Sequence, residues 1–131
     1  MHKIRKPPDS GGHDFRLPQI AKFIGVPLRT ADGWLASARA QGFDPGVSEG
    51  RFRWLSAYHI YGLALLAELA NVGFPITPHT IWSAFDFARV APSAGTHWIA
   101  SNSEASRVTV DAAQCFAVAQ HWAERQRAKA A

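Results

Sequence analysis

Residues Leu17–Trp34, LPQIAKFIGVPLRTADGW, have the pattern of two short helices joined by a tight turn. Ile20 and Ile24 are four residues apart, so they share one face of the first helix. Gly25 follows where that helix should end, and glycine adopts the left-handed conformation of a helix C-terminus without strain. We therefore expect one helix over about 18–25 and a second over 28–41.

The small and apolar residues of this stretch determine how the two helices cross. Ala21 lies between the isoleucines, where a larger side chain would keep a second helix at a distance. Val26 is placed to pack in the corner, and Ala31 and Trp34 form an apolar stripe on the second helix. A small residue, a glycine four positions later and an apolar residue six after that are typical of a helix-turn-helix. An ordinary helical hairpin in a protein core is the alternative.

A turn-rich segment and a short basic strand follow the two helices. Residues 42–50, GFDPGVSEG, are rich in turn formers. The next five residues, RFRWL at 51–55, alternate basic and apolar side chains as a half-buried strand does. Ser56 is placed to cap a third helix over 56–72, which Gly73 ends.

The fourth helix has an equally clear start, and with it the pattern of a known family is complete. Thr77 is suited to cap a helix over 78–90, and Pro78 suits its first position. Together with RFRWLS at 51–56 and an apolar helix ending in NVGFPI at 71–76, this resembles the MerR-like winged helix-turn-helix superfamily. The resemblance spans about residues 17–88. It implies a DNA-binding fold in which a small β-hairpin forms the wing.

The C-terminal part predicts a second hairpin and a helix. Residues 96–100 and 107–110 have the pattern of two strands around the polar turn SNSE at 101–104. Asp111 is placed to cap a last helix running to about Arg127. The expected fold class is therefore mainly α: a winged helix-turn-helix followed by a C-terminal β-hairpin plus helix.

We divide the chain into three parts. Residues 1–15 form a flexible basic arm, in which Lys3, Arg5 and Lys6 either contact the minor groove of DNA or stay solvated. Residues 16–90 form the winged helix-turn-helix domain. Residues 91–131 form the hairpin-helix, the expected dimerisation element.

Charge is distributed unevenly along the chain. Residues 1–56 contain nine Lys or Arg and five Asp or Glu, whereas residues 57–131 contain five of each. The whole net charge of +4 therefore lies on the arm, the helix-turn-helix and the wing. A basic half beside a neutral half is typical of phosphate binding. A soluble face that is merely basic is the alternative.

The expected DNA-binding residues follow from the way each helix faces. If Ala31 and Trp34 point inward, the outward residues of the second helix enter the major groove. Arginines on the wing then contact backbone phosphates, and a lysine of the first helix adds to them. The predicted DNA-binding residues are Lys22, Arg29, Thr30, Asp32, Gly33, Ser37, Arg51 and Arg53.

The third helix is apolar around most of its circumference, which predicts burial on more than one side. Either the C-terminal segment or a second copy of the chain must cover it. We expect both, with a homodimer formed through the C-terminal segment, because large exposed apolar patches mark interfaces. The predicted dimerisation residues are Trp98, Val108, Phe116, Ala119 and Trp122.

Several function classes lack their motifs. No histidine pair has helical metal-ligand spacing and no paired cysteines occur, so we expect no metal, and no other cofactor. A phosphate-binding loop and a nucleophile elbow are absent, so the chain is not expected to be an enzyme. No small-molecule ligand and no membrane segment are predicted. The single cysteine, Cys115, suggests a buried structural thiol and a cytoplasmic protein.

The function expected from the sequence is sequence-specific binding of double-stranded DNA, as a transcription regulator. An architectural role, such as that of a phage or mobile-element excisionase or a DNA-packaging factor, is the first alternative. A protein-interaction adaptor built on a helix-turn-helix scaffold is the second, and Asp32, Gly33 and the low net charge favour it.

Overall fold

The computed structural model describes residues 12–90 and 96–130, which form five helices and five short strands. The helices are α1 (Leu17–Ile24), α2 (Leu28–Ala40), α3 (Ala57–Asn71), α4 (Pro78–Ala88) and α5 (Ala112–Ala130). The strands are β1 (Phe15–Arg16), β2 (Val47–Glu49), β3 (Phe52–Leu55), β4 (Thr96–Ala100) and β5 (Arg107–Asp111). The mainly helical fold with a C-terminal hairpin and helix is thus confirmed.

Helix ends lie close to their predicted positions because local signals set them. Gly25 has a φ of 74°, the left-handed conformation expected at the end of α1. The hydroxyl of Thr77 accepts a hydrogen bond from the N–H of Thr80 at the start of α4. At the start of α5, Asp111 Oδ1 accepts from the N–H of Gln114 at 2.9 Å.

The first sheet has one strand that the sequence did not predict. β2 and β3 pair antiparallel as the expected hairpin, and β1 adds to the other edge of β3, with Phe15 opposite Leu55. Phe15 is 1% exposed and belongs to the core. Assigning residue 15 to a flexible arm is therefore wrong, because its side chain is buried and its backbone is paired. Residues 1–11, which hold the basic residues of the arm, lie outside the described residues.

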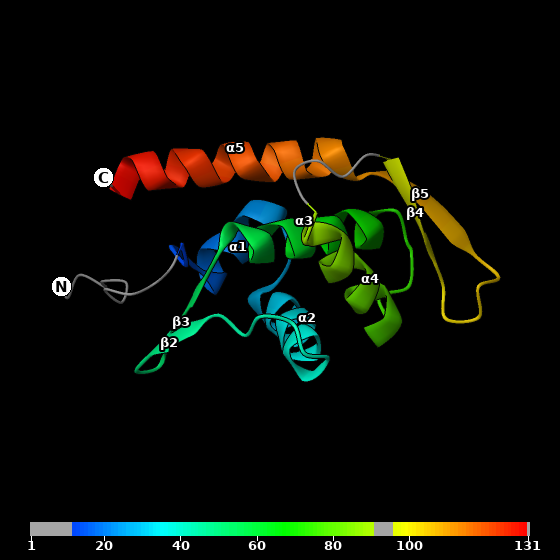
Figure 1. Ribbon diagram of the computed structural model, residues 1–131, viewed down its shortest axis with the longest axis horizontal. Helices are drawn as coiled ribbons and strands as arrows, with labels where there is room; N and C mark the ends of the chain where they lie inside the picture. Colours follow the sequence, from blue (N-terminus) through cyan, green and yellow to red (C-terminus); the bar gives the residue numbers. More distant parts are fainter. Residues whose placement is uncertain (1–11, 91–95, 131) are drawn as a thin grey trace.

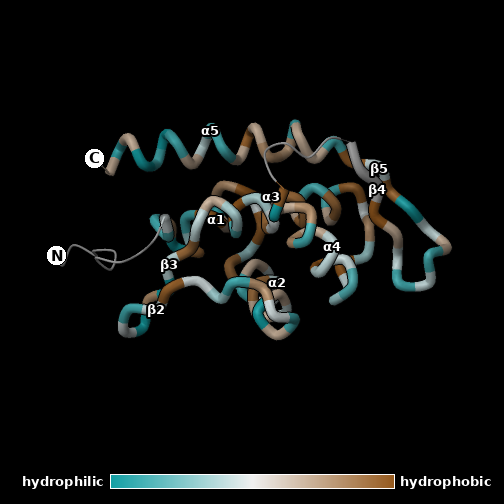
Figure 2. Tube along the Cα trace, viewed as in Figure 1, coloured by the Kyte–Doolittle hydropathy of each residue, from teal (hydrophilic) through white to brown (hydrophobic). Residues whose placement is uncertain are grey.

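The helices are arranged around α3 (Figure 1). In this view α5 lies on one side of α3, and α2 with the β2–β3 hairpin lies on the other, while the β4–β5 hairpin lies at one end. Hydrophobic and hydrophilic stretches alternate along α5 in Figure 2, as they do in a helix with one covered face. Helix α2 and the β2–β3 hairpin thus lie on the opposite side of α3 from α5.

Helix α3 is buried by its own chain. Its large aliphatic side chains are fully covered, namely Ile60, Leu63, Leu65, Leu66 and Leu69. Gly62 lets α4 approach closely, since a Cβ there would lie 2.7 Å from a ring carbon of Phe85. The argument that one chain cannot cover this helix is therefore wrong.

The predicted dimerisation residues are mostly used inside the chain. Phe116 and Ala119 are 0% exposed, and the ring of Phe116 lies 5.4 Å from that of Tyr61 on α3. Trp122 stacks on Phe23 of α1 with ring centroids 4.5 Å apart. Val108 is half-buried against the core, and the side chain of Trp98 lies outside the described residues. Assigning Phe116 and Ala119 to a dimer surface is therefore wrong, because they complete the core of one chain, and Trp122 packs partly buried against that core.

Candidate functional site

Helix α2 has one covered face and one open face. Ala31, Trp34, Leu35 and Ala38 are buried, with Trp34 the most exposed of them at 9%. The opposite face follows from the helical repeat and has Arg29 at its start and Gly33 one turn later. This face is open to a partner, as the sequence predicted.

Gly33 leaves the helix backbone accessible on that open face. No heavy atom outside its own turn lies within 4 Å of the position that a Cβ would take, and its φ is that of an ordinary helix. The fold therefore does not require glycine here. A glycine costs a helix about 1 kcal/mol relative to alanine, and the packing around Gly33 does not offset this cost.

A groove of about 500 Å³ lies where the starts of α1 and α2 meet the wing. It contains four arginine side chains and a single carboxylate, that of Asp32. Such a surface attracts phosphate groups, because arginine presents several N–H donors in a planar fork. The groove is lined by Arg16, Leu17, Pro18, Leu28, Arg29, Asp32, Arg51, Phe52 and Arg53.

Phe52 holds two of these arginines. The guanidinium carbon of Arg16 lies 4.3 Å from the centroid of the Phe52 ring, and that of Arg51 lies 5.9 Å from it. Both distances are within the range of a cation–π interaction. The ring thereby keeps two positive charges beside the turn end of the wing, which lowers the entropy cost of ordering them on a ligand.

Arg53 is anchored to the loop before the wing. Its Nη1 donates a hydrogen bond to the carbonyl of Pro45. That loop is itself fixed, because Gly46 has a φ of 81° and donates its N–H to Asp44 Oδ1 at 2.9 Å. A Cβ at Gly46 would lie 2.7 Å from the carbonyl oxygen of Trp54, so the loop packs tightly against β3.

The structure brings together only part of the predicted DNA-binding set. Arg29, Asp32, Arg51 and Arg53 share the groove. The other four lie outside its lining. Lys22 is exposed in the last turn of α1. Thr30, Gly33 and Ser37 lie on α2, and the Ser37 hydroxyl accepts a hydrogen bond from Nε2 of Gln41, the C-cap residue of α2, at 3.3 Å.

Arg16 is the functional candidate that the sequence analysis missed. It reaches the groove because β1 pairs with β3, which places Arg16 opposite Trp54 and beside Phe52. A two-residue strand has no periodicity to detect, so this pairing has no sequence signature. A basic residue directly before a helix-turn-helix was the single available signal.

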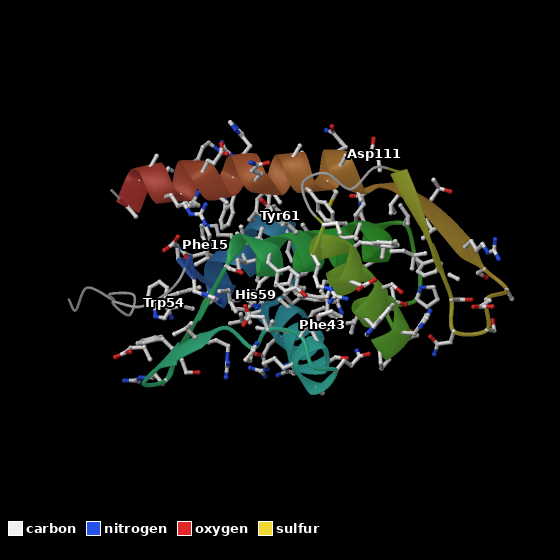
Figure 3. All side chains as sticks on the ribbon, in the orientation of Figure 1. Phe15, Phe43, Trp54, His59, Tyr61 and Asp111 are labelled. Carbon is white, nitrogen blue, oxygen red and sulfur yellow. The ribbon has the colours of Figure 1, made fainter. Side chains whose placement is uncertain are left out.

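A second polar cluster lies between the N-terminal segment, the loop after α2 and the start of α3. His13 Nε2 lies 3.0 Å from Asp44 Oδ2, and His59 Nε2 lies 3.9 Å from the same oxygen. The donor atoms of all three side chains lie within 4.8 Å of one another, which is compatible with a metal ion. Figure 3 shows His59 near the start of α3, on the side that faces α2.

The ionisation of this cluster follows from burial and hydrogen bonding. Burial disfavours the charged ring of His59 and lowers its pKa, although the carbonyl of Asp44 and its carboxylate oppose this. Burial alone would raise the pKa of Asp44, but hydrogen bonds from Gly46 and His13 outweigh it and lower that pKa. An ionised carboxylate and a neutral buried imidazole are the forms that bind metals.

An apolar groove of about 710 Å³ lies between α1, α3, α5 and β5. Cys115 lines it, and burial raises the pKa of this thiol to about 11, with a smaller contribution from Glu68. The thiol is therefore protonated at neutral pH, in accord with the structural role predicted for it. Val118 and Val72 lie at this groove with half or more of their surface exposed.

Comparison of the chain with protein-family models, with curated proteins and with solved structures found no match. In the described residues, every helix is too short or too polar to cross a membrane. The function is therefore inferred from the residues of the chain and from their geometry.

Proposed function

We propose that this protein binds double-stranded DNA in a sequence-specific manner, as a transcription regulator of the winged helix-turn-helix type. The observation that carries the proposal is the arginine-lined groove, which joins the start of α2 to the wing. A helix that enters the major groove needs flanking cations to hold the phosphates on either side. Here α2 supplies the helix, and Arg16, Arg51 and Arg53 supply the cations.

Different side chains of α2 contact different parts of the DNA. Arg29 lies at the start of the helix, from where it reaches a guanine edge or a phosphate. Asp32, one turn further on, accepts from a cytosine amino group or orients Arg29, and both residues line the same groove. Thr30 and Ser37 flank the open face with hydroxyl groups that bond to either base edge or phosphate.

The first experiment measures affinity for a short random-sequence duplex as a function of salt. Each phosphate contact contributes about 0.9 to the slope of log K against log salt, so four contacts predict about a 100-fold loss of affinity between about 50 and 200 mM salt. Arg125→Ala on α5 is the control, since this exposed arginine does not line the groove. No binding at low salt, or binding without salt dependence, would refute the proposal and favour the adaptor function.

Selection of bound sequences from a random pool then distinguishes a transcription regulator from an architectural DNA-binding protein. A regulator enriches one short motif, whereas an architectural factor enriches sequences that share flexibility rather than base identity. We expect a motif, because the side chains of α2 that lie nearest the groove are a charged pair suited to reading G·C base pairs.

We also propose that the protein acts on DNA as a homodimer. A two-fold pair would place two copies of α2 in successive major grooves, roughly 34 Å apart, and would double the number of specific contacts. Phe116 and Ala119 are buried within the chain, so the surface for this pairing has to be formed without them. Light scattering of the protein on a selected site would give the stoichiometry, and a single copy per site would refute the dimer.

A further inference from the structure

We propose that His13, Asp44 and His59 form a binding site for a divalent transition metal, with zinc as the best match. The three residues offer two imidazoles and one carboxylate, a ligand set typical of zinc sites that keep one position open. The proposal does not depend on DNA binding, since it rests on a cluster separate from the arginine groove.

The distances fit a small tetrahedral ion. Zinc–ligand bonds of about 2.0–2.1 Å place neighbouring ligand atoms about 3.3 Å apart. In the structure the Asp44 Oδ2 atom lies 3.0 Å from His13 Nε2 and 3.9 Å from His59 Nε2. The rings of the two histidines have centroids 5.9 Å apart and are inclined by 53°. Movements of well under 1 Å at the carboxylate therefore place Asp44 at this spacing from both histidines, and the histidine donor atoms, which lie within 4.8 Å of one another, close around the ion by rotation of the partly exposed His13 ring.

His59 has a hydrogen-bond partner suited to a metal ligand. Its Nδ1 lies 3.0 Å from the Ser56 hydroxyl and 3.0 Å from the Ser56 N–H, while its Nε2 lies 2.8 Å from the carbonyl of Asp44. Without metal, Nε2 carries the proton and donates it to that carbonyl. In this state Nδ1 accepts from the Ser56 N–H. Binding of an ion by the Nε2 lone pair breaks the bond to the Asp44 carbonyl and moves the proton to Nδ1, so the Ser56 N–H has to turn away while the Ser56 hydroxyl becomes the acceptor. Metal-bound histidines commonly donate their other N–H in this way.

The three ligands are held by the fold and are accessible on one side. His59 is fully buried at the start of α3, whereas the side chains of His13 and Asp44 are 16% and 42% exposed. The N–H of Gly46 positions the other oxygen of Asp44 at 2.9 Å. An ion can thus enter from solvent past Asp44 and keep a water molecule as its fourth ligand.

Metal binding would connect three segments that are distant in the sequence. His13 precedes β1, Asp44 lies in the loop between α2 and β2, and His59 lies in α3. The same loop contains Pro45, the acceptor for Arg53. The ion therefore stabilises the loop that orients the wing, and folding stability rises with metal concentration.

The test is calorimetric titration of the whole chain, free of DNA, with zinc chloride, together with cobalt(II) as a spectroscopic probe. We expect one ion per chain and the intense visible absorption of a four-coordinate cobalt site. His13→Ala and Asp44→Asn should each weaken binding by about 100-fold or more, because loss of an outer partner alone costs 10- to 100-fold. His13 is partly exposed and lies outside the helices and strands, so its variant should keep the fold, which circular dichroism checks.

The controls remove histidines that are outside the cluster. His79→Ala and His121→Ala change exposed residues of α4 and α5, and His2→Ala removes a histidine near the N-terminus. All three should bind zinc as the unmodified chain does. The proposal is overturned if zinc does not bind at about 100 μM, if His13→Ala binds equally well, or if one of the controls abolishes binding.

Discussion

Gly33 and Cys115 show how much a single position can reveal about function. Gly33 has open space around it and a backbone conformation that any residue can adopt, so packing does not explain it. Cys115, in contrast, lines an apolar groove beside the core, and burial suppresses its ionisation. Packing therefore accounts for the chemistry of Cys115, whereas it does not account for glycine at position 33.

Replacing Gly33 with alanine should separate stability from binding. Alanine favours the helix by about 1 kcal/mol, so the Gly33→Ala variant should be more resistant to urea. If α2 approaches DNA closely at this position, the added methyl group should lower affinity for a selected site. Urea unfolding and anisotropy titrations measure the two effects. A variant that is more stable and binds equally well would show that close approach is not the reason for the glycine.

The thiol of Cys115 should react slowly in the folded protein. Its pKa of about 11, against an ordinary value of 9.0, makes the thiolate about 100 times rarer at pH 8 than in the unfolded chain. The raised pKa also means that this group contributes stability that is fully present below pH 9 and is lost as the pH rises towards 11. Labelling with a thiol reagent, with and without urea, measures this directly because the chain has one cysteine. Equal labelling rates in the two states would contradict the burial.

At the scale of elements, the helices are predictable and the edge strand is not. Caps such as Thr77 and Asp111 act within a few residues of themselves, so their effect is visible in the sequence. β1 consists of two residues and exists because β3 offers it hydrogen-bond partners. That pairing brings Arg16 into the groove, so the arginine site is larger than the sequence predicted.

The helix and the wing should respond differently to loss of an arginine. Arg29→Ala on α2 should weaken DNA binding and relax the selected motif, with a cost of about 1–3 kcal/mol at the base that it reads. Arg53→Ala and Arg51→Ala on the wing should weaken all sequences about equally and reduce the salt slope by about 1. Sequence selection and salt titrations test both.

The two wing variants serve as controls for each other. Arg53 also bonds to the carbonyl of Pro45, so its loss could disturb the loop, whereas Arg51 is exposed and has no such role in the described structure. Identical selected motifs for the unmodified protein and Arg29→Ala would refute the role of Arg29. A changed motif for Arg51→Ala would refute the division between helix and wing.

At the scale of the whole molecule, α5 closes the core. Phe116 contacts Tyr61, Trp122 stacks on Phe23, and Arg127 forms an ion pair with Asp14 at 3.0 Å. These contacts join the C-terminal helix to α1, to α3 and to the residue before β1. The apolar surface of α3 is therefore covered without a second copy of the chain.

This arrangement predicts a contrast between two positions on α5. Phe116→Ala should lower the free energy of unfolding by about 3–5 kcal/mol, because it opens a cavity in the core. Val118→Ala, on the same helix at a half-exposed position, should cost well under half of that. Urea unfolding at two protein concentrations measures both values. If the loss at Phe116 depended on protein concentration, Phe116 would lie in a dimer interface after all.

The sequence by itself determined the order and approximate limits of the helices, the caps, the open face of α2 and the partial burial of Cys115. These depend on residues within a turn or two of one another. The tertiary structure alone decided that Arg16 joins the wing, that α5 covers α3, and that His13, Asp44 and His59 meet. Each of these depends on contacts between residues far apart in the chain. Such contacts leave no periodic pattern in the sequence, because the residues are brought together by the way the helices and strands between them pack.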